Sequence, residues 1–234
     1  MSSVNKCLLI GNSRWHWATE INGEWSFSHK DPNIYELKSN QYSLLKWAAV
    51  GELPNGINLD PKKEILIQHI PLNNIPPWIG IDRAIASWIA FKKANEEQKE
   101  KSDLLVADAG TIMSINKIKR NGEFVGGQLI AGLRLQLAAM VSGAKNLHKI
   151  NQSNISEIEA FPLETSKAMQ RGCIQALTGA LIEAQKEAKS ELWLCGGDAN
   201  LLYEELKRKN LDVKCYPNLV LEGIVDLINL EMNT

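Results

Sequence analysis

The chain has 234 residues, of which 44% are hydrophobic, enough for one large domain or two of ordinary size. Its 26 basic and 27 acidic residues nearly balance, which argues against a surface built to bind nucleic acid or an anionic membrane. No apolar run approaches the ~20 residues of a membrane span, and the N-terminus lacks the charged-then-apolar order of a signal peptide. The four cysteines are widely spaced in apolar segments, so we expect buried free thiols in a cytoplasmic protein.

The predicted strands and helices alternate along the chain, which favours an α/β fold. Short apolar runs predict strands at residues 7–10, 64–70, 104–107, 112–118, 192–195 and 213–216. Apolar residues at three-and-four spacing predict helices from Asp82 into the polar run 92–101, over 130–144, over 169–184 and from about Ala199. The proline-rich residues 71–77 and the polar residues 146–162 are expected to be loops.

The beginning of the chain recurs about 99 residues later, with Gly11 corresponding to Gly110. An apolar run leads into Gly11-Asn12-Ser13 in the first copy and into 108–111 in the second, and an Asn-Gly pair follows each glycine by 11 positions. Each copy is typical of a strand, a small-residue turn, a second strand and a reversing Asn-Gly turn. Two such hairpins could face each other across a cleft and bind the phosphates of one nucleotide through backbone N–H groups and hydroxyls. The repeat therefore predicts a two-lobed phosphotransferase.

Two polar motifs could carry chemistry. Asp108 closes a predicted strand beside Gly110 and Thr111, a combination that suits a cation and a phosphate. An Asx-type turn explains the same residues, but the copy at 11–13 favours the phosphate site. Asp82 and Arg83 begin a predicted helix, where they could deprotonate a hydroxyl and hold an anionic substrate. On local evidence alone, a helix N-cap with an ordinary surface arginine is the simpler interpretation.

The glycine pairs and the histidines are less informative. Gly126 and Gly127, which end the second hairpin, and Gly196 and Gly197, which follow a predicted strand, permit either a ligand or a neighbouring backbone to come close. The four histidines show no metal-ligand spacing, and core or surface roles are expected for them.

In chain order, these motifs resemble the type III pantothenate kinase family, which belongs to the acetate kinase, sugar kinase, Hsp70 and actin superfamily. The family's Asp-x-Gly-Asn-Thr is matched by residues 9–13, its Gly-x-Asp-Arg by 80–83 and its Asp-x-Gly-Thr by 108–111. Its Gly-Gly-x-Ile-x-Pro-Gly is matched by 126–132, with Ala131 in place of proline, and its Thr-Gly-Gly by 195–197. Thr165, seven residues before Gly172, corresponds to a threonine that contacts substrate in the family.

The resemblance implies a two-lobed, duplicated ribonuclease-H-like α/β fold, with lobes at 1–102 and 103–234. It implies transfer of the ATP γ-phosphoryl group to pantothenate, giving 4'-phosphopantothenate for coenzyme A, by a homodimer. Asp82 would accept the hydroxyl proton, and Asp108 would bind potassium or ammonium, with magnesium arriving on ATP. The expected pantothenate contacts are Gly80, Ile81, Asp82, Arg83 and Thr165. The expected ATP contacts are Leu9, Ile10, Gly11, Asn12, Ser13, Arg14, Trp15, His16 and Thr111.

The chain departs from the family pattern at three positions. Leu9 replaces an acidic residue associated with the magnesium of the nucleotide, Asn116 replaces a second aspartate, and Asn73 falls where a tyrosine is common. Leu9 and Asn116 favour an alternative, a non-catalytic relative that binds nucleotide or pantothenate in a regulatory role. The intact aspartates at 82 and 108 argue for the kinase. A sugar or acetate kinase would require domain insertions that 234 residues do not easily accommodate.

Overall fold

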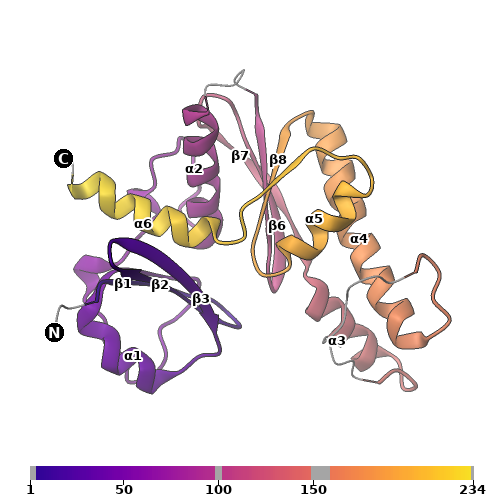
Figure 1. Ribbon diagram of the computed structural model, residues 1–234, viewed down its shortest axis with the longest axis horizontal. Coiled ribbons are helices and arrows are strands. Elements are labelled where there is room, and N and C mark those ends of the chain that lie inside the picture. The colour runs from indigo at the N-terminus through magenta and orange to yellow at the C-terminus, as the bar shows by residue number, and fades with distance from the viewer. Residues whose placement is uncertain (1–3, 98–101, 149–158, 233–234) are drawn as a thin grey trace. The chain divides into compact units, whose positions relative to one another are not determined.

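The computed structural model describes residues 4–97, 102–148 and 159–232, and these group into two compact units (Figure 1). Unit 1 comprises Met1–Lys99, Gly122–Phe124 and Asn218–Thr234, and unit 2 comprises Glu100–Asn121 and Val125–Pro217. The chain passes from unit 1 to unit 2 after Lys99 and rejoins unit 1 for Gly122–Phe124. It returns to unit 1 after Pro217, because the last helix packs on a helix of that unit.

Unit 1 contains a four-stranded sheet in the order β3-β2-β1-β4, in which the first three strands form an antiparallel meander and β4 runs parallel to β1. The strands are β1 (Lys6–Ile10), β2 (Trp15–Ile21), β3 (Glu24–Lys30) and β4 (Leu44–Ala49). Asn22 and Gly23 join β2 to β3 with φ of 53° and 85°, the left-handed pair that a type I′ hairpin turn requires. The reversing Asn-Gly turn predicted here is confirmed.

The two faces of this sheet pack against different elements. Leu8, Ile10, Trp15 and Trp17 share one face and form a core with residues of α1 (Ile34–Asn40) and β4. Cys7, Leu9 and His16 lie on the other face, because successive side chains of a strand alternate. Helix α6 (Leu219–Met232) contacts β1, β2 and β4 and begins beside His29, which shares that second face.

Helix α6 packs closely on α2 (Ile81–Glu96). A Cβ atom at Gly223 would lie 2.5 Å from Cγ2 of Ile85 and 3.3 Å from Cβ of Ile89, so this glycine allows the two helices to approach. Lys92 and Asp226 form an ion pair of 2.5 Å beyond that crossing. The predicted helix from Asp82 is confirmed and begins one residue earlier.

The strand predicted at 64–70 is wrong. Short 3-10 helices occupy Pro61–Lys63 and Ile67–His69, with a single bridge from Glu64 to Trp47 between them. The Asp60 side chain accepts from the Lys62 N–H, and His69 Nδ1 accepts from the Leu66 N–H. Local side-chain bonds therefore satisfy backbone groups that a strand would have offered to a neighbour.

Unit 2 contains a five-stranded sheet in the order β7-β6-β5-β8-β9. Strand β5 pairs antiparallel with β6 and parallel with β8, and β8 pairs parallel with β9. The strands are β5 (Leu104–Ala109), β6 (Ile112–Ile118), β7 (Phe124–Ala131), β8 (Glu191–Cys195) and β9 (Val213–Cys215). The helices are α3 (Leu133–Gly143), α4 (Thr165–Ala188) and α5 (Ala199–Lys207). The predicted strands and helices in this region are confirmed, with ends shifted by up to a few residues.

A single core unites one face of this sheet with all three helices. Leu105, Ala107 and Ala109 of β5 point into it, as do Leu177 and Leu181 of α4. Asp108 is the second-to-last residue of β5, and because strand side chains alternate, it lies on the opposite face of the sheet. All four cysteines are free thiols, three of them buried and Cys215 half-buried, close to the expectation. Across the part of the chain that the structure describes, we find no helix with the length and hydropathy to span a bilayer.

Candidate functional site

The first predicted phosphate turn connects β1 to β2 through Gly11–Arg14. The Gly11 N–H donates to the Arg14 carbonyl oxygen at 3.1 Å, and a Cβ atom at position 11 would lie only 2.8 Å from that oxygen. Glycine is therefore needed for the turn to close. Asn12 and Ser13 form its exposed tip, where a ligand could reach their backbone and side chains.

Three of the predicted ATP contacts have side chains in the interior. Ile10 and Trp15 belong to the core on one face of the sheet, and Leu9 is 5% exposed on the other face. A ligand at this turn could reach only the backbone of Ile10 and Trp15. The buried hydrocarbon of Leu9 has no lone pair for a metal ion or for the water of its hydration shell.

The second predicted phosphate turn, Gly110 and Thr111, connects β5 to β6 in two residues. The first turn, between β1 and β2, has four residues. In both copies the Asn-Gly pair follows the glycine by 11 positions, because the connection after β6 is longer than the Asn-Gly turn after β2. Of the second Asn-Gly pair, only Gly122 has a left-handed φ, 79°. The two copies therefore share a hairpin plan but differ in both turns.

Two glycines from distant parts of unit 2 pack against this second turn. A Cβ atom at Gly132 would overlap the Gly110 carbonyl oxygen, and the Gly132 N–H donates to the Thr111 carbonyl at 2.9 Å. A Cβ atom at Gly196 would overlap Oδ1 of Asp108, and Gly196 has a left-handed φ of 93°. Close packing is therefore the established role of Gly132 and Gly196.

Two other glycines of these motifs, Gly126 and Gly197, are not packed against neighbouring atoms. A Cβ atom at Gly126 or Gly197 would meet nothing within 4 Å, so a ligand can approach either backbone. Asp108 is half-buried at the end of β5, beside Gly196 and the Gly110 turn. The structure thus brings together, at the end of β5, the Asp108–Thr111 match, Gly132 from the end of the Gly-Gly match and Gly196 from the Thr-Gly-Gly match.

The Gly80–Arg83 motif forms the first turn of α2 in unit 1. Gly80 is the N-cap and Asp82 lies two positions into the helix, so the interpretation of Asp82 as a simple N-cap is wrong. Asp82 Oδ1 accepts from the Arg83 backbone N–H at 2.8 Å, and a Cβ atom at Gly80 would lie 2.6 Å from the same oxygen. Glycine at position 80 leaves the room that the carboxylate occupies.

Burial raises the pKa of Asp82 above its ordinary value of 3.8, although the Arg83 backbone N–H and guanidinium oppose the shift. Burial also lowers the pKa of Arg83. A half-buried carboxylate with a raised pKa is a stronger base than an exposed one, which suits the removal of a hydroxyl proton.

The loop before Gly80 is fixed by backbone bonds. The Asn73 N–H donates to the Gly122 carbonyl and the Phe124 N–H donates to the Asn73 carbonyl, each at 2.9 Å. Asn73, which stands where the family often has tyrosine, therefore anchors the loop through its backbone. Trp78, two residues before the cap, is 84% exposed and offers a large apolar surface next to the motif.

Thr165 is the first residue of α4, and it is exposed in unit 2. Gly80, Ile81, Asp82 and Arg83 belong to unit 1, as do the residues of the first turn, whereas Asp108 and Thr111 belong to unit 2. The segment 149–158, within the predicted loop before Thr165, lies outside the described residues.

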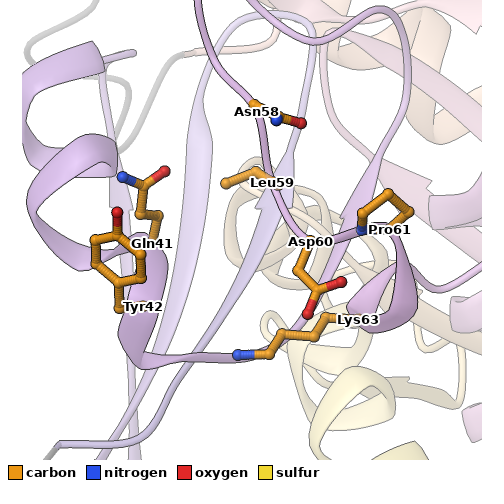
Figure 2. Close-up of a pocket in the computed structure, with 7 residues that line it drawn as sticks. All are labelled: Gln41, Tyr42, Asn58, Leu59, Asp60, Pro61 and Lys63. Atoms are coloured by element: carbon orange, nitrogen blue, oxygen red, sulfur yellow. The ribbon is translucent and has the colours of Figure 1, made fainter.

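A surface pocket elsewhere in unit 1 contains none of the predicted site residues. Figure 2 shows Gln41 and Tyr42 on one side of it and the segment from Asn58 to Lys63 on the other. Its Asp60 carboxylate caps a 3-10 helix, and its Lys63 ammonium donates to the Leu44 carbonyl at 2.5 Å. These charged groups are engaged in local structure, so we assign no ligand to the pocket.

Comparison with known proteins identifies a family that this sequence matches. The sequence model described as type III pantothenate kinase matches residues 69–187. A type III pantothenate kinase of Synechococcus elongatus is 28% identical, over 93% of this chain and 93% of that protein. One from a Nostoc species is 30% identical, over 94% of this chain and 93% of its own length.

Solved structures with this fold are more distant in sequence. A conserved Campylobacter jejuni protein assigned to the Baf family has a TM-score of 0.61 at 20% identity, over 98% of this chain and all of that one. An archaeal actin homologue has a TM-score of 0.52 at 12% identity, over 99% and 100%. The chain therefore shares the actin-like fold of these structures. With a family match over half of its length and relatives that align almost end to end, the chain belongs to the type III pantothenate kinase family.

Proposed function

We propose that this protein transfers the γ-phosphoryl group of ATP to the primary hydroxyl of pantothenate, the first step of coenzyme A synthesis. The observation that carries the proposal is the half-buried Asp82 carboxylate, held at the start of α2 by Gly80 and the Arg83 N–H. The family match supports the substrate, because its relatives are named for it.

In the proposed reaction Asp82 accepts the proton of the attacking hydroxyl. The hydroxyl oxygen forms a bond to the γ-phosphorus, the bond from that phosphorus to the β-γ bridging oxygen breaks, and ADP leaves with the electron pair. Arg83 holds the carboxylate or amide of pantothenate by charge-assisted hydrogen bonds. Gly80 and Ile81 shape this end of the substrate site. Thr165, in unit 2, stays a predicted pantothenate contact.

Each of the two turns is a proposed contact for phosphate groups of ATP. Asn12 and Ser13, at the exposed tip of the first turn, supply backbone N–H groups and a hydroxyl, while the Gly11 N–H closes the turn by donating to Arg14. Arg14 and His16 adjoin this turn, and Thr111 supplies a hydroxyl from the second turn. Asp108 fits a monovalent cation, potassium or ammonium, because a half-buried carboxylate supplies oxygen ligands. Magnesium, when bound to ATP, neutralises charge that develops on the transferring group.

The proposed assembly is a homodimer formed through one edge of unit 2. Strand β7 is the edge strand of its sheet, and it exposes Val125 and Leu129, 50% and 62% respectively. Leu135 and Met140 of α3 are also exposed. An apolar edge strand favours association, and a second copy would cover it. Sedimentation velocity tests this: Leu129→Glu should shift a dimer towards monomer, and a monomeric wild type would contradict it.

A coupled assay of ADP release tests the activity. With ATP, magnesium and potassium, ADP release should require pantothenate and should fall when Asp82 is replaced. The alternative, a non-catalytic relative, is supported by the apolar Leu9 in the first turn. It predicts that ATP or pantothenate binds without turnover. Binding without pantothenate-dependent ADP release would therefore replace the proposed kinase with that alternative.

A further inference from the structure

A chain of hydrogen bonds leads from the start of α6 to the first phosphate turn. His29 Nε2 lies 2.8 Å from Oδ1 of Asn218, and His29 Nδ1 lies 2.7 Å from Nδ1 of His16. His16 and His29 are directly opposite each other on β2 and β3. All three residues belong to unit 1, so one compact body holds the whole chain of bonds.

With both rings neutral, the bonds determine which ring nitrogen of His16 lacks a proton. Oδ1 of an amide only accepts, so His29 Nε2 carries a hydrogen and donates to Asn218. In a neutral ring the other nitrogen is then bare, so His29 Nδ1 accepts from a proton on His16 Nδ1. By the same rule His16 Nε2 has a free lone pair. Burial, together with the nearby His29 and Arg14, lowers the pKa of His16 to about 4, in agreement with a neutral ring.

The bare nitrogen faces the phosphate turn. A Cβ atom at Gly11 would lie 3.2 Å from His16 Nε2, so this atom lies against the backbone of the turn. His16 is also the direct cross-strand partner of Leu9, and the side chains of such partners project from the same face about 5 Å apart at Cβ. His16 therefore places an acceptor next to the position from which the carboxylate is missing.

We propose that His16 Nε2 accepts a hydrogen bond from a water molecule bound to the divalent cation of the nucleotide, in place of a carboxylate at position 9. The inference rests on the proposed function, because the cation arrives with ATP. A bare imidazole nitrogen repels phosphate oxygens, which are acceptors, and attracts the polarised hydrogens of metal-bound water. Magnesium keeps several of its waters in proteins, so a single acceptor at hydrogen-bond distance is sufficient. His29 and Asn218 are positioning residues that act through His16.

Two substitutions at position 16 separate the two nitrogens. In His16→Asn the side-chain amide is short and retains a polar group near Nδ1 only, whereas in His16→Gln an amide oxygen reaches the region of Nε2. ADP affinity is measured by calorimetry on the full chain, once with magnesium and once with EDTA. A hydrogen bond to a charged group corresponds to about ten- to a hundredfold in affinity. We expect His16→Asn to lose that factor with magnesium only, and His16→Gln to keep most of it.

Three results would overturn the inference. Both variants could keep the wild-type ADP affinity with magnesium. His16→Asn could lose the same factor in ADP affinity with magnesium and with EDTA. Finally, both variants could lose the same factor with magnesium only. The second would mean that His16 contacts the nucleotide itself. The exposed His148 in unit 2 gives a matched control, His148→Gln, which should not change either affinity. A wild type that binds no ADP under either condition contradicts the proposed function rather than the role of His16, so the two failures are distinguishable.

The ring tautomer gives a readout that needs neither a variant nor turnover. A long-range ¹H–¹⁵N correlation spectrum of the wild type should show His16 with the proton on Nδ1 and a bare Nε2. Addition of ADP with Mn²⁺ in place of magnesium should broaden the ring signals of His16 more than those of His148. A proton on His16 Nε2, or no preferential broadening, would refute the proposal even if the variants failed to fold.

Discussion

Replacement of Asp82 by asparagine isolates the charge of the proposed base. The amide keeps an oxygen that can accept the Arg83 N–H, which Asp82 Oδ1 now accepts at 2.8 Å. The N-cap is Gly80, which caps without a side chain, so the substitution removes no cap. Asp82→Asn therefore changes basicity and charge while the first turn of α2 retains its hydrogen bonds.

The expected loss of turnover is large. A positioned general base supplies ~10²–10⁴-fold in rate. At 1.36 kcal/mol for each factor of ten, this corresponds to about 3–5 kcal/mol of transition-state stabilisation. Because the proposed contact of Asp82 is with the hydroxyl rather than with ATP, the Michaelis constant for ATP should change little. The measurement is ADP release at saturating pantothenate and ATP.

The same substitution should not destabilise the fold. Burial raises the pKa of Asp82 in the folded state, so the folded state binds a proton over a pH window in which the unfolded chain has released it. The wild type therefore loses stability as pH rises from the ordinary aspartate pKa through the raised one, and Asp82→Asn lacks that loss. Its melting temperature at pH 7 should equal or exceed that of the wild type.

Asp60→Asn is the matched control, because exposed Asp60 also accepts a backbone N–H, from Lys62 at 3.0 Å, in the same unit. It should leave turnover unchanged. Near-wild-type turnover in Asp82→Asn would refute the base assignment. A clearly lower melting temperature at pH 7 would refute the argument that the carboxylate is held at a cost to stability.

Three further predictions follow from the same geometry. Gly80→Ala should lower turnover by displacing the Asp82 carboxylate, whereas Gly179→Ala, in open space on α4, should not; equal effects in ADP release would contradict this. In urea unfolding, Leu9→Ala should lower the free energy of unfolding by about 2–5 kcal/mol, because Leu9 is 5% exposed. Leu9→Asp should lower it further, because the buried charge is unpaired. Urea unfolding of Leu9→Asp unchanged from wild type would contradict this. Activity should be far lower in sodium than in potassium or ammonium, and Asp108→Asn should erase the difference; equal rates of the wild type in all three salts would reject a cation at Asp108.

The hairpins could be predicted because their signals are local. The Asn22-Gly23 pair specifies its turn by two left-handed residues, and apolar runs locate β1, β5, β6 and β8. Strand β4 and the terminal helix α6 were not identified, since the apolar residues of Leu44–Ala49 fit either periodicity and α6 carries apolar residues on most of its faces. The wrong strand at 64–70 reflects side-chain bonds from Asp60 and His69 that outcompete sheet pairing.

The site motifs were visible in the sequence, but the way they support one another was not. Gly132 and Gly196 could be found as glycines, yet only the fold brings them against the Gly110 turn and Asp108. The bond from His29 to Asn218 joins residues 189 positions apart, and no pattern near either residue indicates it. Such contacts depend on where α6 returns to the first sheet, which is a property of the tertiary fold.

Pantothenate is the proposed phosphoryl acceptor, and mass spectrometry of the reaction product identifies the acceptor. The full chain is incubated with ATP, magnesium, potassium and pantothenate, in parallel with Asp82→Asn. We expect pantothenate heavier by one phosphoryl group in the wild-type reaction, with far less in the variant over the same time. Unmodified pantothenate in a reaction where folded wild-type protein binds ATP would contradict it.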